Sequence, residues 1–255
     1  MTKSVAFVAV EGIPLIKPGD PLASILVDAL KAASLPLDSG DVVVVAQKIV
    51  SKAEGRYVDL ADVEPSPRAR DYAGQTGKDP RFVEVVLSES SDVIRVAPNV
   101  LIVAHRLGFI MANAGIDQSN IEHGDGAERV LLLPKNPDAA AAALKAALDE
   151  AFGVTCGVII NDSFGRPWRN GVTGVALGAA GIPSLIDMVG SPDMFGRKLQ
   201  MTEIALADEV AAGASLVMGQ AAEGLPVVLV KGLDLSAPAR PASALIRDRA
   251  KDLFR

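Results

Sequence analysis

The sequence predicts a mixed α/β fold, of the α+β type with mixed sheets, and three observations support this. Helical and strand-like segments alternate along the chain, with hairpins interspersed among crossover connections. Apolar residues gather in short runs such as "VVVVA" and "VLLL", which are typical of buried strands and far shorter than the roughly 18 apolar residues of a membrane-spanning helix. With 255 residues and 49% hydrophobic content, the chain can bury a substantial core.

The first 60 residues predict two strands and a helix. One strand is expected near Val5–Val10. Asp20 and Pro21 are typical of a helix start, with the aspartate as N-cap and the proline at the first helical position. The segment "GDVVVVAQKIVSKAEGR" then predicts a buried strand that leads into a polar segment. The apolar face of the expected helix consists of Leu22, Ile25, Leu26, Ala29, Leu30 and Ala33.

A group of short elements follows, and residues from about 66 to 130 are expected to form a separate lobe within a single domain of residues 1–255. Ser-Pro and Asp-Pro pairs each predict a helix start, and Gly77 predicts the end of the first helix. The expected elements are helices from Ser66-Pro67 and from Asp79-Pro80, a hairpin of Val93–Val96 and Val100–His105 around Pro98-Asn99, and a third strand in "GFIMANAGID".

The second half of the chain alternates helices and strands more regularly. Glycines at 171, 174, 178 and 181 indicate a closely packed segment rather than a flexible linker. The expected elements are helices at Pro137–Phe152, Thr202–Val217 and Pro241–Phe254, and strands at Thr155–Asn161 and in "PVVLVKG".

Composition excludes several functional classes. The net charge is −6, with 25 basic and 31 acidic residues and no basic tract, which argues against nucleic acid as the main partner. The single cysteine, Cys156, cannot form an intrachain disulfide, and no signal peptide or membrane span is evident. A cytoplasmic protein is therefore expected. Two histidines and one cysteine disfavour a structural zinc site, so any metal should be a hard cation on oxygen ligands.

The motifs of common enzyme classes are missing. The chain has no P-loop, no dinucleotide fingerprint and no nucleophile elbow, and Cys156 lies in an apolar segment where a thiolate is costly. His105 is expected to be structural, and His123 to lie on a loop surface. Trp168 could either cover the core or present a flat face to an aromatic ligand.

Two acidic segments share a pattern of oxygen ligands. "ANAGIDQSN" offers Asp117 and Asn120, and "IINDSFGR" offers Asp162 and Ser163, each where a strand is expected to end. Such oxygens suit Mg²⁺ or Mn²⁺, with nucleotide phosphates completing the coordination shell. When each segment is taken alone, ordinary turn and capping roles are the commoner explanation of the same residues.

Two further segments could contact a phosphate. "LVMGQAAEGLP" is a glycine-flanked polar turn after a helix, for which a simple helix C-cap is the commoner explanation. "VVAQKIVSKAEGR" places Lys48 and Lys52 after a buried strand, where a lysine can bind phosphate or lie in solvent.

These segments occur together in the order and spacing of one enzyme family. The segments that match in order and spacing are "EGIPLIKPGD", "VVVVAQKIVSKAEGR", "ANAGIDQSN", "IINDSFGRPWRNGVTGVALG", "DMFGRKLQMTEIALADEVA" and "LVMGQAAEGLPVVLVKG". From about residue 5 to 235 the chain resembles the coenzyme F420:L-glutamate ligase family. The resemblance implies a two-lobed α/β fold, an intertwined homodimer, and GTP-dependent addition of L-glutamate to the terminal carboxylate of the deazaflavin F420-0. Further γ-linked glutamates would follow, with release of GDP and phosphate and with Mg²⁺ or Mn²⁺ and K⁺ as cofactors.

The resemblance also implies roles for individual residues. Asp117 and Asp162 would hold one divalent ion, and Ser163 and Gln220 would approach a second. Some members carry a carboxylate in place of Gln220 and a threonine in place of Ser163, and a neutral amide binds a divalent ion less strongly. The nucleotide would be contacted by Ile13, Pro14, Leu15, Ile16, Gln47, Lys48, Lys52, Asn120, Met218, Gly219, Gln220, Ala221, Ala222, Glu223, Gly224 and Leu225.

The remaining expectations concern mechanism and alternatives. Phosphoryl transfer to the acceptor carboxylate would give an acyl phosphate that the glutamate amine attacks, with Asp117, Asp162 and Arg166 as catalytic groups. Arg166 and Arg169 could bind carboxylate or phosphodiester oxygens bidentately. Some relatives fuse a flavin-binding C-terminal domain, and a stand-alone ligase is expected here. The alternatives are a metal-dependent nucleotide hydrolase and a nucleotide- or deazaflavin-binding protein without turnover.

Overall fold

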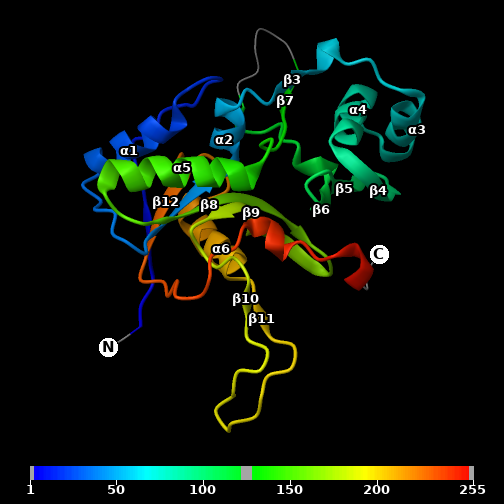
Figure 1. The fold of residues 1–255 in the computed structure, drawn as a ribbon. Helices are drawn as coiled ribbons and strands as arrows, with labels where there is room; N and C mark the ends of the chain where they lie inside the picture. Colours follow the sequence, from blue (N-terminus) through cyan, green and yellow to red (C-terminus); the bar gives the residue numbers. More distant parts are fainter. Residues whose placement is uncertain (1–2, 122–127, 253–255) are drawn as a thin grey trace.

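A five-stranded mixed sheet forms the centre of the computed structural model, which describes residues 3–121 and 128–252 (Figure 1). Strands β2 and β8 are parallel, and every other neighbouring pair is antiparallel. The predicted mixed α/β class is confirmed. The strands lie in the order β1 (Ala6–Ala9), β12 (Val227–Lys231), β2 (Val42–Ala46), β8 (Gly157–Arg166) and β9 (Arg169–Ala180).

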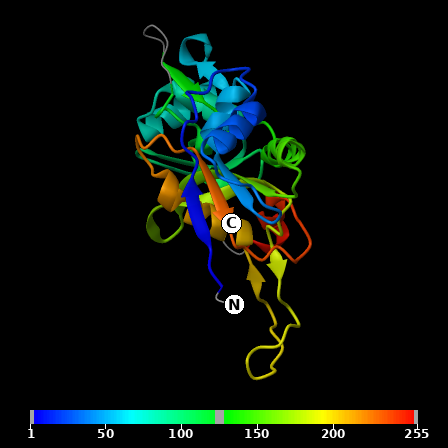
Figure 2. The ribbon, with the colours of Figure 1, turned by 90° about the vertical axis from the view of Figure 1, so that its left-hand side faces the viewer.

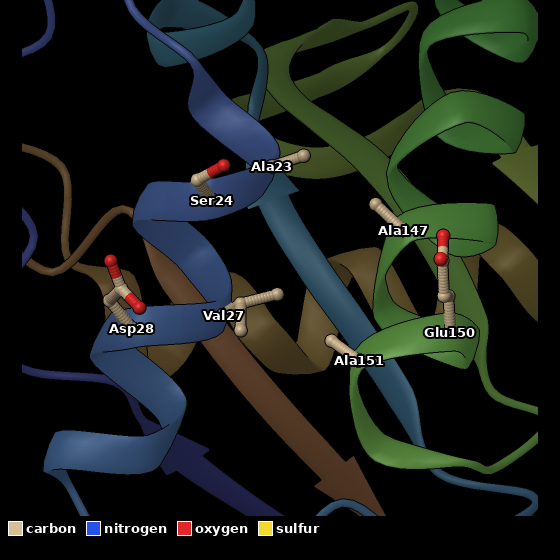
Figure 3. A pocket seen from close by; sticks show the side chains of 7 residues that line it. All are labelled: Ala23, Ser24, Val27, Asp28, Ala147, Glu150 and Ala151. Carbon is tan, nitrogen blue, oxygen red and sulfur yellow. The ribbon is translucent and has the colours of Figure 1, made fainter.

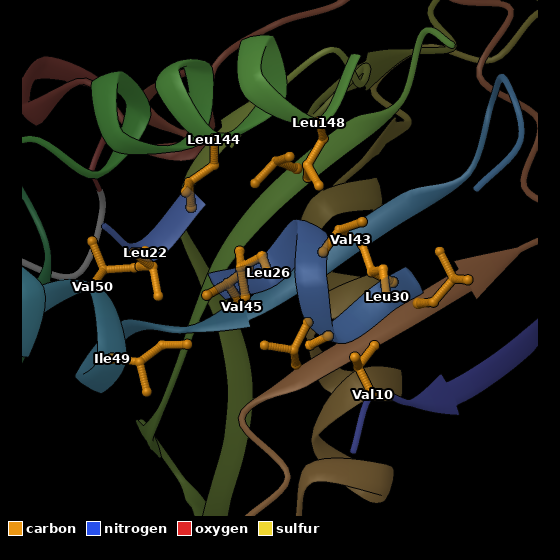
Figure 4. Packing of buried hydrophobic residues seen from close by; sticks show 14 of the residues in the cluster. Val10, Leu22, Leu26, Leu30, Val43, Val45, Ile49, Val50, Leu144 and Leu148 are labelled. Carbon is orange, nitrogen blue, oxygen red and sulfur yellow. The ribbon is translucent and has the colours of Figure 1, made fainter. Parts of the chain in front are cut away.

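Helices cover both faces of this sheet. On one face, α1 (Leu22–Ala32) and α5 (Pro137–Phe152) pack over β2 and β8, and Figure 4 shows Leu26 and Leu144 pointing toward Val45 in this layer. On the other face, α6 (Leu206–Met218) packs against the alternate residues of the same strands. The continuous run "VVVV" is therefore explained by burial of β2 on both faces.

Glycines let α5 and α6 approach β9 closely. A Cβ atom added to Gly174 would lie 2.3 Å from the carbonyl oxygen of Ala211 in α6, and one on Gly178 would lie 2.3 Å from that of Pro137 in α5. The expectation of close packing is confirmed at Gly174, Gly178 and Gly181 but was wrong at Gly171, where an added Cβ meets nothing within 4 Å. The outer edge of β9 is also closed, because Ala176 N–H donates to Asp208 and Ala179 N–H donates to Asp138.

A second hydrophobic core lies in the part of the chain between Leu60 and Leu132, close to the range expected for a separate lobe. The expected caps are confirmed: Ser66 Oγ accepts the Ala69 N–H, and Asp79 accepts the Arg81 N–H. The helix α2 (Gln47–Ala53) precedes this part and packs on the main core. The elements that follow are β3 (Tyr57–Asp59), α3 (Pro67–Thr76), α4 (Pro80–Ser88), the predicted hairpin β4 (Ser90–Ala97) and β5 (Val100–His105), β6 (Ile110–Ala112), and β7 (Arg129–Leu131), which pairs with β3.

A long hairpin projects away from the rest of the molecule (Figures 1 and 2). Its base is formed by β10 (Ile186–Asp187) and β11 (Glu203–Ile204), which pair antiparallel. The projecting residues 188–202 carry large apolar side chains in solvent. These are Val189, Met194, Phe195 and Met201, of which Met194 is 95% and Phe195 94% exposed.

Three predicted boundaries in the first two thirds of the chain were wrong. Asp20 does not cap α1, because its carboxylate accepts the Lys17 N–H and the helix begins at Leu22. The segment after β2 is the helix α2, whose Ile49 and Val50 are buried. The strand expected to end at Asn161 continues to Arg166, because β9 pairs with it along its whole length.

Two predictions near the C-terminus also need correction. The helix expected at Thr202–Val217 begins only at Leu206, after the short strand β11. The helix expected at Pro241–Phe254 is absent from the described residues, where two short 3₁₀ turns occur instead, and Phe254 lies outside that range. The N–H groups of Ala242 and Ser243 donate to Asp138, which holds this segment across the start of α5.

The close packing of β9 against α5 gives a testable prediction. Gly178→Ala forces a Cβ into the backbone of Pro137, so we expect a loss of about 1–3 kcal/mol in the free energy of unfolding, measured by urea denaturation. Gly165→Ala is the matched control, since a Cβ there meets nothing within 4 Å. Equal stability of the two variants would contradict the packing argument.

Candidate active site

Several predicted segments meet at one end of the five-stranded sheet, here called the carboxyl edge and defined as residues 11–16, 47–52, 161–163 and 219–225. Strands β1, β2 and β8 run in the same direction and all end there, while β12 begins there after the turn that follows α6. Ala46 pairs with Asn161, so β8 extends beyond β2 from Asp162 onward. Ligands of α/β sheets commonly bind at such an edge.

Asp117 reaches the carboxyl edge from the part of the chain that holds the second hydrophobic core (Leu60 to Leu132), here called the second lobe, and is held by two residues of α2. The Gln47 side chain is buried, and Ser51 Oγ donates to its Oε1 at 3.0 Å, which fixes the orientation of the amide. Gln47 Nε2 then donates to Asp117 Oδ2 at 2.7 Å, and Lys48 Nζ lies 3.1 Å from Asp117 Oδ1. The lysine also contacts Ser119 Oγ at 3.4 Å.

The turn before Asp117 has an unusual backbone. Asn113 and Ala114 have φ angles of 51° and 53°, in the left-handed region that non-glycine residues rarely adopt. Ala114 is fully buried, and a Cβ on Gly115 would lie 2.7 Å from Met111, so packing enforces the turn. No periodicity in the sequence indicates this feature, which determines where Asp117 lies.

Asp117 and Asp162 form an acid pair. Burial, together with the negative charge of Asp117, raises the pKa of Asp162 to about 7. Burial also raises the pKa of Asp117, although the charge and hydrogen bond of Lys48 oppose this effect. Lys48 offsets only part of the negative charge of these two carboxyl groups, so a divalent cation fits them. The described residues contain no group of three or more His, Cys, Asp or Glu that could hold a metal ion, and Mg²⁺ commonly uses one or two carboxylates plus phosphate oxygens.

Ser163 and Gln220 are brought together on the other face of β8. Ser163 Oγ donates to Gln220 Oε1 at 2.8 Å, and the neighbouring Asn161 Nδ2 donates to Ser215 Oγ of α6. Because successive side chains of a strand alternate between faces, Asp162 points the opposite way. The acid pair and the Ser163–Gln220 pair therefore lie on opposite faces of β8. A single ligand can contact both pairs only by passing around the side of β8 that is left unpaired beyond the end of β2.

The turn after α6 is linked to the loop that carries Asn120. Lys52 Nζ donates to the Asn120 carbonyl at 2.7 Å, and Asn120 Nδ2 donates to the Ala221 carbonyl at 2.9 Å. Glu223 accepts the Ala221 N–H and lies over Gly219, where an added Cβ would fall 2.2 Å from the Glu223 carboxyl carbon. Met218 is buried, whereas Ala222, Glu223 and Gly224 are exposed and Leu225 is half-buried.

The four residues predicted to line a nucleotide site after β1 differ in exposure. Ile16 belongs to the main core, and Ile13 packs against it. Pro14 is exposed, and Leu15 is 87% exposed. Leu15 is therefore the one large apolar side chain of this segment that could contact a ligand.

The tip of the β8–β9 hairpin carries two arginines and the tryptophan. Arg166 and Arg169 are direct cross-strand partners, and neither forms an ion pair with a residue in the described part of the chain. Trp168 is 82% exposed, so the alternative that it covers the core was wrong. Arg166 lies four residues beyond Asp162, roughly 13 Å at 3.3 Å per residue, so its backbone is distant from the acid pair.

Sequence reasoning missed an ionic cluster centred on Glu89. Glu89 Oε2 accepts from Arg56 Nη2 at 2.8 Å and from Arg106 Nε at 3.0 Å, and His105 Nε2 lies 3.5 Å away. His105 is buried, and its Nδ1 accepts the Leu107 N–H, which fits the expected structural role. Burial opposes ionisation of Glu89, but the nearby His105, the hydrogen bonds from Arg56 and Arg106 and the charge of Arg56 lower its pKa to about 2.

Other expected sites are poor candidates for chemistry. Cys156 is buried, and burial raises the pKa of its thiol to about 12. His123 lies outside the described residues. A groove between α1 and α5 is lined by small side chains with the acids Asp28 and Glu150, and it contains none of the residues of the carboxyl edge (Figure 3). All the described helices are too short or too polar to span a lipid bilayer.

Comparisons with known proteins show which family this chain belongs to. A family model described as F420-0:gamma-glutamyl ligase matches residues 12–232. Proteins named coenzyme F420:L-glutamate ligase are 44% identical in Methanothermobacter thermautotrophicus (98% of this chain, 99% of that protein), 46% in Methanopyrus kandleri (96% and 97%) and 42% in Methanocaldococcus jannaschii (88% of each). The protein is therefore an enzyme of the ligase class. It belongs to the F420-0:gamma-glutamyl ligase family.

The Glu89 cluster gives a pH-dependent prediction. The pKa of Glu89 is lower in the folded protein than its ordinary value of 4.5, so its ionisation stabilises the fold above pH 4.5. This stabilisation is lost as the pH falls toward 2. Glu89→Gln should therefore cost about 2–3 kcal/mol in the free energy of unfolding at pH 7, and clearly less at pH 3.

Urea denaturation at both pH values measures this difference. Glu64→Gln is the control, because the Glu64–Arg70 pair is an exposed ion pair and should contribute little. If the loss in the free energy of unfolding caused by Glu89→Gln is the same at pH 7 and at pH 3, the lowered pKa assigned to Glu89 is ruled out.

Proposed function

We propose that the protein is a GTP-dependent ligase that adds L-glutamate to the terminal carboxylate of F420-0 and then further γ-linked glutamates, releasing GDP and phosphate. The observation that carries the proposal is the half-buried Asp117–Asp162 pair, located where α2, the Asn120 loop and the turn at 218–225 converge. The relatives' printed names and the matching family model support the acceptor and the glutamate donor.

The first chemical step would activate the acceptor. A carboxylate resists attack by an amine because its leaving group would be oxide or hydroxide. In the proposed step, an acceptor carboxylate oxygen forms a bond to the γ-phosphorus while the bond from that phosphorus to the GDP oxygen breaks. The products are an acyl phosphate and GDP. Positioning and charge neutralisation are the main requirements of this transfer, which suits a site without a covalent nucleophile.

The second step would form the amide. The glutamate nitrogen attacks the acyl carbon, the carbon–oxygen bond to phosphate breaks, and the nitrogen loses its proton to solvent. The described site has two half-buried carboxyl groups, one of which has a pKa of about 7, but no serine or cysteine activated as a nucleophile. Direct transfer through a mixed anhydride therefore fits this chain better than a covalent enzyme intermediate does.

The acid pair would hold a divalent cation. Mg²⁺ or Mn²⁺ on Asp117 and Asp162 would neutralise charge on the transferred phosphoryl group. Lys48, which is now paired with Asp117, would then be available to the phosphate oxygens. Ser163 and Gln220 offer two neutral oxygens, which suit a second divalent ion weakly, and K⁺ remains part of the proposal.

The remaining nucleotide contacts would come from exposed parts of the carboxyl edge. Leu15 offers an apolar surface, while Lys52 and Asn120 lie beside the turn at 218–225. Arg166 and Arg169, which lack ion-pair partners among the described residues, would bind anionic groups of the acceptor. The cytoplasmic location stays a prediction.

A homodimer is part of the same proposal. The hairpin at 188–202 exposes Met194, Phe195 and Met201 far from the main body (Figures 1 and 2). Exposed apolar patches of this kind commonly mark interaction surfaces. A projecting arm that packs on a second copy would produce the intertwined arrangement.

The oligomeric proposal predicts a change in mass in solution. The double variant Met194→Ser and Phe195→Ser should sediment as a monomer at micromolar concentration, whereas the unmodified protein sediments as a dimer. Ile94→Ser, at a partly exposed apolar residue outside the hairpin, is the control and should remain dimeric. A monomeric unmodified protein would overturn this part of the proposal.

The catalytic proposal is tested by mass spectrometry of F420-0 incubated with the protein, L-glutamate, GTP, Mn²⁺ and K⁺. We expect products that differ by one glutamyl unit. Asp162→Asn keeps the shape of the side chain but removes a metal-binding charge, so the rate should fall about a hundredfold or more. Asp62→Asn, at an exposed aspartate, is the control and should retain activity.

Two results would contradict the catalytic proposal. GTP hydrolysis that proceeds without glutamate or F420-0 would favour a nucleotide hydrolase. Tight binding of both ligands without any product would favour a binding protein.

A further inference from the structure

A pocket of about 220 Å³ lies beside the acid pair, on the far side from the proposed nucleotide contacts. Its walls come from the loop before β6, from β8 and β9, from the start of α6, and from the C-terminal segment, which passes beside β9 (Figure 1). The lining residues are Gly108, Phe109, Ile110, Phe164, Val175, Ala176, Asp208, Leu245, Ile246, Arg247 and Asp252.

Strand register places this pocket next to Asp162. Phe164 follows Asp162 by two residues on β8, so both side chains lie on the same face, roughly 6–7 Å apart. Val175 is the direct cross-strand partner of Asp162 on β9, so its side chain lies on that face as well. Two independent neighbours of the acid pair therefore form one end of the pocket.

The walls of the pocket suit a flat ring with a polar edge. Phe109 and Phe164 meet edge to face, with ring centroids 6.4 Å apart and planes at 65°, and Val175, Leu245 and Ile246 add aliphatic surface. The Asp208 carboxyl group lies at one side. One of its oxygens accepts the Ala176 N–H at 2.9 Å, and no other hydrogen bond to this group comes from the described residues.

We propose that this pocket binds the planar heteroaromatic end of the acceptor, with the rings against Phe164 and Ile246 and a ring N–H donating to Asp208. The inference rests on the proposed function, because it takes the acceptor to be a deazaflavin whose carboxylate reacts at Asp162. The acceptor would then span from the acid pair to the pocket, and the nucleotide would approach Asp162 from the opposite side.

The other substrates fit the pocket less well. Glutamate and a growing glutamyl tail carry carboxylates, which apolar walls and the acids Asp208 and Asp252 disfavour. The guanine base is also flat, but the segments proposed for the nucleotide adjoin β1, β12 and β2. The pocket adjoins β9, at the opposite end of the strand order.

The test measures binding of F420-0 through the absorbance and fluorescence of its own ring, together with KM values for F420-0 and GTP. Ile246→Trp fills the pocket from the C-terminal segment, away from the acid pair. We expect the Kd and KM for F420-0 to rise tenfold or more while the KM for GTP stays unchanged. Asp208→Asn keeps an acceptor for Ala176 but presents N–H groups to the ring, so binding should weaken severalfold.

Ile94→Trp on β4 is the matched control and should bind F420-0 normally, because Ile94 is partly exposed and lies outside the pocket. If Ile246→Trp does not fold, as judged by circular dichroism, Phe164→Leu replaces it and should show the same selective loss. Unchanged F420-0 affinity in these variants, or a rise in the KM for GTP instead, would overturn the inference. Unmodified protein that forms no product would count against the proposed function, while the binding measurements would still decide the pocket.

Discussion

The parallel pairing of β2 with β8 is the constraint on which the rest of the structure depends. It brings the ends of two strands that are distant in sequence to the same edge, and it leaves β8 longer than its neighbour by five residues, from Asp162 to Arg166. Beyond the end of β2, side chains on both faces of β8 can therefore contribute to a site. An acid can therefore point toward α2 while the next residue, Ser163, points toward the turn after α6. A single strand thus contributes to two groups of side chains.

The second constraint is the connection between the two lobes. Asp117 comes from one lobe, Asp162 comes from the main sheet, and Gln47 and Lys48 come from the helix between them. The Glu89 cluster joins the β4–β5 hairpin to Arg56, just after that helix. The helix is thereby attached at both ends, through Asp117 at its start and through Glu89 beyond its last turn. Lobe motion that separated the acids would have to break charged hydrogen bonds with little solvent access.

Sequence patterns predicted the parts of this structure that local chemistry determines. Ser66 and Asp79 cap their helices because serine and aspartate accept N–H groups at helix starts, and β2 is buried because valine favours a two-sided interior. Asp117, Asp162 and Lys48 also converge at the carboxyl edge, whereas Arg166 and Arg169 lie at the distant tip of the β8–β9 hairpin. The helix α2 escaped prediction because its buried Gln47 and Ser51 are polar and satisfy each other. Glu89 and Arg56 are 33 residues apart, and the left-handed turn at Asn113 depends on packing, so no local pattern could reveal either feature.

The closed outer edge of β9 has a consequence for how copies of this chain can meet. An unpaired edge strand offers a row of N–H and carbonyl groups to any passing strand, and that is a common route to fibril growth. Here the carboxylates of Asp138 and Asp208 accept hydrogen bonds from two N–H groups on the outer edge of β9. Asp138 also accepts the Ala242 N–H, which holds the C-terminal segment against the same region. Recruitment of a foreign strand at β9 would have to displace two carboxylates and a covering segment. Growth of the sheet by addition of a further strand at β9 is therefore disfavoured.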